Sequence, residues 1–182
     1  MSKQAQNLLI DNISKKMIKK VHFGDEGIFS EAIYSDCEKY RYVLSRTWDK
    51  KLEKILFIGL NPSTATELKN DPTVTRMIGY AKKWNFGSIS VCNAFAFRTT
   101  FPEELKKVEE PVGKENDKLI AEESKKAKMV IAAWGNHGQF LGRSKEVLKL
   151  LNETYHLGLT KQGEPKHPLY LKADLKPAFF RG

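Results

Sequence analysis

The segment Lys54–Thr66, KILFIGLNPSTAT, constrains the fold of this chain more than any other stretch. Its apolar run Ile55–Ile58 ends abruptly at Gly59, a pattern typical of a short buried strand in the middle of a parallel sheet. The strand cannot continue through Pro62, because proline lacks a backbone donor and fixes its φ. We therefore expect Asn61 at the carboxyl end of the strand, where open α/β sheets bind ligands.

Strands and helices alternate after this segment. Three more buried strands are predicted, at Ile89–Cys92, Lys128–Ala133 and Tyr155–Leu159. Helical segments are predicted between them, from Pro72 to about Trp84, in a short turn at Pro102–Glu104, at Asn116–Lys126 and at Arg143–Leu151. The alternation predicts a three-layer αβα fold with a central, mainly parallel four-stranded sheet.

Two further elements precede this core. Residues 3–20 have apolar positions at helical spacing and predict an amphipathic helix. The runs Ile28–Tyr34 and Tyr40–Arg46 flank a short polar loop and predict a β-hairpin. We expect one domain over residues 1–182, with residues 1–40 as an N-terminal extension and residues 41–172 as the core.

The composition limits the function and the cellular location. A formal charge of +9 favours nucleic acid or nucleotides as partners, although a merely lysine-rich surface would give the same total. No apolar run is long enough to span a membrane, and no signal-peptide pattern is present, so we expect a cytoplasmic protein. Cys37 and Cys92 have no metal-binding or redox spacing, and no metal or other cofactor is predicted.

The ends of the four predicted strands carry the polar groups from which a site could be built. They deliver Asn61, Asn93, Trp134 and the loop with His167 to one edge of the sheet. A carboxamide presents a donor beside an acceptor, which suits the edge of a nucleobase, and a histidine can donate to a developing anion. The sequence contains no Walker A motif, no GxGxxG motif and no recognisable nucleophile motif.

Several neighbouring residues have two interpretations each. Asp71 is expected to cap the helix that begins at Pro72, and it is the first carboxylate to consider as a general base. Arg76 and Arg98 could clamp a phosphate or carboxylate, or could form surface ion pairs. The remaining candidate substrate contacts are Pro62, Ser63, Phe97, Trp134 and Leu169, whereas His137 is assigned a supporting role.

These strand ends resemble the motifs of a known family. The segments involved are Ile58–Ala65, Asp71–Thr73, Asn93–Arg98, Ala133–Gly135 and His167–Tyr170. Together they resemble an uncharacterised bacterial and phage family, domain of unknown function sixteen-forty-three, from about residue 41 to residue 172. That resemblance implies no established activity.

The same landmarks are similar, more distantly, to the uracil-DNA glycosylase superfamily. The similar segments are Gly59–Pro62, Val91–Ala94 with Arg98 and Thr99, Ala133–Asn136 with Gln139, and His167–Leu169. This resemblance implies a glycosylase-like fold and hydrolysis of an N-glycosidic bond. Asn61 would position the attacking water, Asn93 would read the base, His167 would stabilise the departing base, and Leu169 would act as a wedge.

Two departures from the superfamily pattern leave the substrate open. Ser63–Ala65 differs from its first motif, and Pro168 passes directly to Leu169, which shortens the wedge loop. A flipped base, a free base, a nucleotide or a modified base could occupy the crevice. The leading prediction is a glycosylase-like hydrolase, and the alternatives are a non-catalytic nucleic-acid or nucleotide-binding module and an enzyme acting on a small nucleoside-like molecule.

Overall fold

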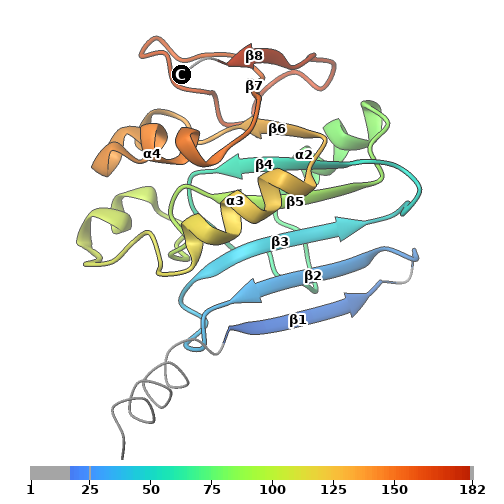
Figure 1. Cartoon of the computed structure of the whole chain (residues 1–182), viewed down its shortest axis with the longest axis horizontal. Helices are drawn as coiled ribbons and strands as arrows, with labels where there is room; N and C mark the ends of the chain where they lie inside the picture. Colours follow the sequence, from blue (N-terminus) through green and yellow to red (C-terminus); the bar gives the residue numbers. More distant parts are fainter. Residues whose placement is uncertain (1–16, 25, 181–182) are drawn as a thin grey trace, which may run out of the picture.

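A computed structural model describes residues 17–24 and 26–180, and it contains one eight-stranded mixed sheet (Figure 1). The strand order is β1-β2-β3-β5-β4-β6-β7-β8. The strands are β1 (Ile18–Phe23), β2 (Phe29–Tyr34), β3 (Arg41–Thr47), β4 (Lys54–Gly59), β5 (Ser88–Asn93), β6 (Met129–Ala132), β7 (Thr154–His156) and β8 (Ala178–Phe180). The predicted α/β class is confirmed.

The predicted four-stranded, mainly parallel sheet is wrong in extent. The four strands β5-β4-β6-β7 are parallel, as expected, but antiparallel strands extend them on both sides. The predicted hairpin, β2 and β3, joins the sheet directly, because β3 pairs with β5 from Leu44 opposite Val91 to Thr47 opposite Ser88. At the other edge, β8 is a three-residue strand directly after Pro177, and a segment that short has no recognisable alternation.

The predicted N-terminal helix is contradicted at its end. Residues 1–16 lie outside the described residues, but Ile18, Lys19 and Lys20 belong to β1 and pair with β2. The burial of β1 alternates from one residue to the next, as expected for a strand with only one covered face. Pairing with β2 has therefore overridden the helical spacing of the apolar residues.

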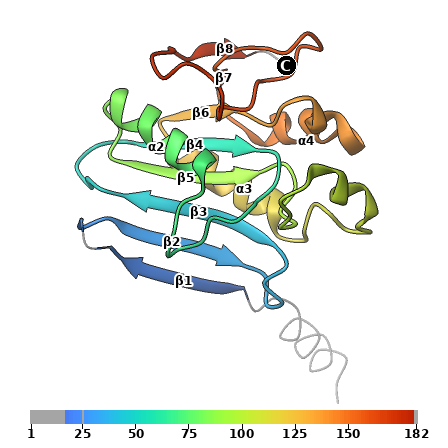
Figure 2. The same ribbon diagram turned by 180° about the vertical axis from the view of Figure 1, so that it is seen from behind.

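Helices cover both faces of the sheet. Helix α2 (Pro72–Lys83) packs on the face seen in Figure 2, and α3 (Asn116–Lys126) and α4 (Arg143–Leu150) pack on the face seen in Figure 1. The 3₁₀ segments η1 (Pro102–Lys107) and η2 (Asn136–Gly142) lie in the connections. None of the helices in the described residues is both long and apolar enough to cross a membrane.

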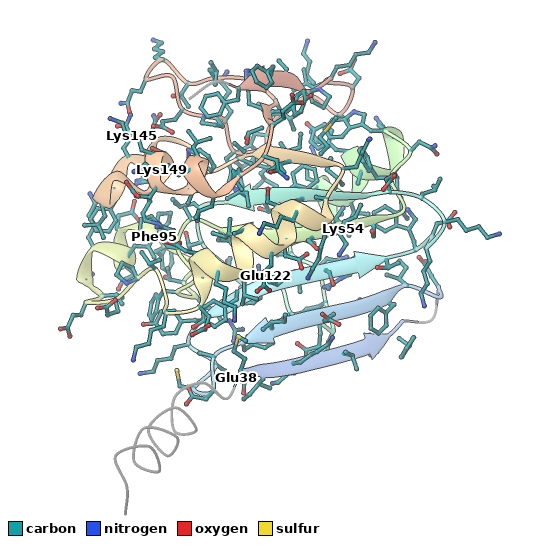
Figure 3. All side chains as sticks on the ribbon, viewed as in Figure 1. Glu38, Lys54, Phe95, Glu122, Lys145 and Lys149 are labelled. Atoms are coloured by element: carbon teal, nitrogen blue, oxygen red, sulfur yellow. The ribbon has the colours of Figure 1, made fainter. Side chains whose placement is uncertain are left out.

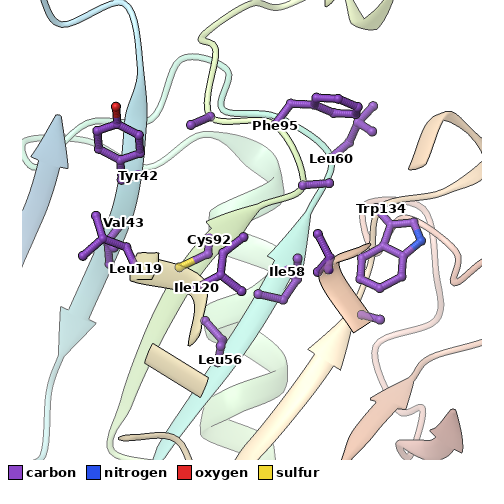
Figure 4. Close-up of a cluster of buried hydrophobic side chains, with 14 of the residues drawn as sticks. Tyr42, Val43, Leu56, Ile58, Leu60, Cys92, Phe95, Leu119, Ile120 and Trp134 are labelled. Atoms are coloured by element: carbon purple, nitrogen blue, oxygen red, sulfur yellow. The ribbon is translucent and has the colours of Figure 1, made fainter. Parts of the chain in front are cut away.

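The central strands divide the core into two clusters, because successive side chains point to opposite faces. On β4, Leu56 and Ile58 pack in the cluster beneath α3 and α4, together with Ile120 and Trp134 (Figure 4). The alternate residues of β4 pack beneath α2 with its residues Val74, Met77, Tyr80 and Ala81. Burial on both faces fixes the register of β4 and thereby the position of the turn that follows it.

Candidate functional site

A cavity of about 370 Å³ lies at the carboxyl ends of β4 and β5. Six of the residues predicted from the sequence line it: Asn61, Ser63, Asp71, Asn93, Trp134 and His167. They come from three strand ends, the cap of α2 and the loop after β7. The structure therefore brings together residues that are separated by up to about a hundred positions in the chain.

The carboxamide of Asn61 is fixed by two backbone carbonyl oxygens. Its Nδ2 donates to the carbonyl of Thr99 at 2.7 Å and to that of Pro62 at 3.2 Å. Thr99 in turn donates its backbone N–H to the carbonyl of Pro62 at 2.9 Å. The donors of Asn61 are thus used within the protein, and Oδ1 is left as the atom that can accept from a water or ligand.

Asn93 occupies space that Gly59 leaves vacant. A Cβ built on Gly59 would lie 2.7 Å from the Oδ1 of Asn93, so only glycine permits this placement of the carboxamide on the neighbouring strand. Asn93 is 3 % exposed, and its Nδ2 has no hydrogen-bond partner in the described part of the protein. A buried and unpaired donor in a cavity wall is suited to a ligand acceptor.

Two buried side chains support the backbone that follows β5. Asn116 donates from Nδ2 to the carbonyl of Asn93 at 2.9 Å. Arg143 donates from Nε to the carbonyl of Ala94 at 3.0 Å and pairs with Asp117 at 2.6 Å. The carbonyl groups at the strand end are therefore satisfied from the α3 and α4 face, which leaves the side chain of Asn93 available to the cavity.

Asp71 has the predicted capping geometry. Its Oδ1 accepts the backbone N–H of Val74 at 2.8 Å, and Pro72 occupies the first turn of α2. The cap bond uses only one of the two carboxylate oxygens, and Oδ2 accepts no hydrogen bond from the described residues. The cap and the proposed general base are therefore compatible in one side chain.

His167 lines the cavity although the residue as a whole is exposed. Loss of hydration lowers the pKa of its imidazole, and the nearby negative charge of Asp71 offsets part of this effect. Nδ1 accepts the backbone N–H of Leu169 at 3.4 Å, an interaction that favours the tautomer with the proton on Nε2. A neutral His167 can therefore donate a hydrogen bond from Nε2.

Trp134 connects the end of β6 to the segment that precedes His167. Its indole Nε1 donates to Glu164 at 2.7 Å, and the backbone N–H of Gly135 donates to the carbonyl of Pro165 at 2.8 Å. Trp134 is 1 % exposed and packs in the core cluster beneath α3 and α4. His137, which was assigned a supporting role, also lines the cavity.

Five of the predicted contacts lie outside the cavity lining. Phe97 packs edge-on against Tyr40, and Arg98 lies over the ring of Tyr34 at 5.1 Å. Pro62 is buried and contributes only its carbonyl group. Arg76 and Leu169 line a neighbouring groove of about 600 Å³, to which Asp71 also contributes.

Arg41 lines the cavity, and the sequence analysis missed it. It begins β3 and is 2 % exposed, and its Nη1 donates to the carbonyl of Ala65 at 2.5 Å. Burial lowers its pKa to about 10, against the opposing effects of Tyr34 and Asp71, so it remains charged at neutral pH. Nothing in its local pattern, an arginine at the start of an apolar strand, indicates that it points inward.

The described residues contain no group of three or more His, Cys, Asp or Glu side chains that could hold a metal ion. The family model described as "Protein of unknown function (DUF1643)" matches residues 41–169. The chain belongs to this family. The match begins at Arg41, and every residue that lines the cavity lies within it. No curated protein and no solved structure matches the chain.

Proposed function

We propose that this protein binds a nucleobase or nucleotide in the cavity and hydrolyses its N-glycosidic bond. The observation that carries the proposal is that Asn61, Asn93 and His167 line one cavity. These are the residues that the resemblance to the uracil-DNA glycosylase superfamily assigns to the water, the base and the departing base. The volume of about 370 Å³ is within the range of about 300–1,000 Å³ for small-ligand sites.

Asn61 and Asp71 act on the water. With its Nδ2 held by two carbonyl groups, Asn61 presents Oδ1 as an acceptor that orients a water molecule toward C1′ of the sugar. The oxygen of this water bonds to C1′ while the C1′–N bond breaks, and the electron pair of that bond passes to the base nitrogen. Asp71 receives the water's proton on Oδ2, and the proton is then transferred to the departed base.

Asn93 and His167 act on the base. The buried Nδ2 of Asn93, which has no partner among the described residues, donates to a carbonyl oxygen or ring nitrogen of the base. His167 donates from Nε2 to the base as negative charge develops on it. The lowered pKa of His167 keeps the imidazole neutral, which is the form that donates from Nε2 to the departing base.

A mononucleotide is a better substrate than a base in duplex DNA. A wedge must project from the surface, but Leu169 is half-buried and lines the groove along α2 beside Arg76. The basic residues that give the formal charge of +9 are also interspersed with acidic ones on this surface. Lys149 pairs with Glu146 on α4, and Figure 3 shows Lys145 and Lys149 on the same face as Glu122 of α3. Neither observation favours a dedicated surface for duplex DNA.

The experiment is an assay for release of free base. The purified protein is incubated with nucleoside 5′-monophosphates and with single-stranded oligonucleotides carrying modified bases, and the released base is quantified by chromatography. We expect release that falls at least about 100-fold in Asn61→Ala, the order of loss seen when one positioned group is removed. Asn136→Ala is the matched control, because Asn136 follows β6 but does not line the cavity.

Each result has a defined meaning. Turnover unchanged in Asn61→Ala would refute the hydrolytic mechanism, and failure to bind any nucleotide or oligonucleotide would refute the proposal as a whole. Ligand binding without turnover, retained in Asn61→Ala, would establish the non-catalytic alternative. Steep weakening of binding with salt would indicate a polynucleotide, since only a ligand with several phosphate contacts releases many counterions.

A further inference from the structure

Arg41 differs from the other buried arginines of the described chain in how few hydrogen bonds it makes. Arg46 is 3 % exposed and uses all three guanidinium nitrogens, donating to Asn70 and to backbone carbonyl groups. Arg143 is 5 % exposed and is held by Asp117 and the carbonyl of Ala94. Arg41 is the most buried of the three, yet within the described residues its guanidinium makes a single hydrogen bond, from Nη1 to the carbonyl of Ala65.

The unpaired part of Arg41 is the edge that recognises oxyanions. Its Nε is buried without a partner, and its Nη2 donates to no described group. These two nitrogens carry parallel N–H groups, the geometry with which arginine binds two oxygens of a carboxylate or phosphate. No carboxylate of the described residues forms an ion pair with Arg41, and the more distant negative charge of Asp71 offsets the buried guanidinium only in part.

The surroundings of Arg41 in the cavity also favour an anion. Arg41 begins β3 beside the carboxyl end of β5, since its backbone N–H donates to the carbonyl of Ala96 at 3.0 Å. The unpaired Nδ2 of Asn93 lines the same cavity. Asp71 is the one carboxylate among the lining residues, and its Oδ1 is engaged at the N-terminus of α2. The unsatisfied groups are therefore mainly donors, and they require an acceptor-rich, negatively charged partner.

We propose that Arg41 binds the phosphate of a nucleotide, so that the ligand of this cavity is a nucleoside monophosphate and not a free base or nucleoside. This inference rests on the proposed function, which supplies the base-binding half of the ligand. Arg41 supplies a phosphate-binding group inside the cavity. The two arginines predicted from the sequence for this role, Arg76 and Arg98, lie outside the cavity lining. A bound phosphate would compensate the buried positive charge of Arg41 and thereby stabilise the folded protein.

The test compares matched ligands by isothermal titration calorimetry. The four common nucleoside 5′-monophosphates and the corresponding nucleosides are titrated into the wild type, Arg41→Gln, Arg41→Lys and Arg46→Gln. For the wild type we expect the monophosphate to bind about 10- to 100-fold more tightly than its nucleoside. Arg41→Gln should bind the monophosphate and the nucleoside equally. Arg41→Lys should keep part of the preference, because lysine retains the positive charge but not the two parallel N–H groups of the guanidinium. Arg46→Gln removes the same charge from the same strand outside the cavity and should keep the full preference.

The outcomes separate this inference from the proposed function. Equal binding of nucleoside and monophosphate by the wild type would overturn the role of Arg41 and leave the proposed function standing. A preference that persists in Arg41→Gln, or that is lost equally in Arg46→Gln, would also overturn it. If no nucleoside or nucleotide binds, both fail. If Arg41→Gln does not fold, the wild-type preference and the partial preference of Arg41→Lys decide the question.

Discussion

Replacing Gly59 by alanine tests the packing that places Asn93 in the cavity wall. The new Cβ would lie 2.7 Å from Oδ1 of Asn93, at least about 0.7 Å closer than ordinary van der Waals contact. The other atoms near it, Cγ of Asn93 at 3.8 Å and the carbonyl oxygen of Cys92 at 4.0 Å, are at normal separations. Only the end of the Asn93 side chain must therefore move.

The expected cost in stability is small and the expected cost in binding is large. Overpacking a core costs about 1–3 kcal/mol, and a single rotatable carboxamide places Gly59→Ala near about 1 kcal/mol. The rotation withdraws the Nδ2 donor of Asn93 from the ligand, and a lost hydrogen bond to a buried group costs about 1–3 kcal/mol, or roughly 10- to 100-fold in affinity.

Two measurements and one control decide this prediction. Urea denaturation followed by tryptophan fluorescence gives the free energy of unfolding, and calorimetry with nucleoside 5′-monophosphates gives the affinity. Gly79→Ala is the control, since Gly79 lies on α2 with nothing within 4 Å of an added Cβ. It should gain about 0.5–1 kcal/mol in stability and bind as the wild type does. Wild-type affinity in Gly59→Ala would refute the role assigned to Asn93.

Three other predictions concern ionisable residues. Asp71→Ala should lose the cap and about 1 kcal/mol in the free energy of unfolding, measured by urea denaturation. Asp71→Ser should keep the cap and the stability but lose base release in the chromatographic assay. Burial raises the pKa of Glu123, but hydrogen bonds from Lys126 and Ser90 and the charge of Lys54 outweigh it and hold the pKa below its usual value. The ionised Glu123 therefore stabilises the protein fully above about pH 4.5, and this contribution is lost as the pH falls through its folded pKa. In Glu123→Gln the urea midpoint should depend less on pH between pH 7 and pH 3 than it does in the wild type. Base release should remain high to below pH 6.5, because only the neutral form of His167 serves, and a midpoint above pH 6.5 would contradict this.

The sequence was sufficient for the central part of the fold. The apolar run that became β4 is bounded by residues with strong backbone preferences, and its neighbours in the sheet follow the same pattern. Helix α3 begins and ends at the predicted residues, and α2 has the predicted cap at Asp71. In each case local preference and tertiary packing require the same structure, so reasoning from the sequence succeeds.

The errors occurred where pairing between distant segments decides the structure. β1 is a strand because β2 lies beside it, and β8 exists because β7 offers a free edge. Arg41 was missed for a related reason, since its burial depends on the segment Ala65–Asn70, which follows the central turn and folds over β3. From the sequence alone, a charged residue at the start of a strand is predicted to be exposed, because the segment that covers it is not known.

Strand β2 supports the site from outside the cavity lining, although it precedes the predicted boundary at residue 40. Ala32 and Tyr34 of β2 are fully buried in the cluster beneath α2, and the hydroxyl of Tyr34 donates to Glu67 at 2.9 Å. This bond holds the same covering segment to which Arg41 donates. A chain that begins at residue 41 would lose β2 and expose the edge of β3 that carries Arg41. We therefore expect such a chain to lose cooperative unfolding by urea denaturation, and a stable truncated chain with unchanged nucleotide affinity would contradict this dependence.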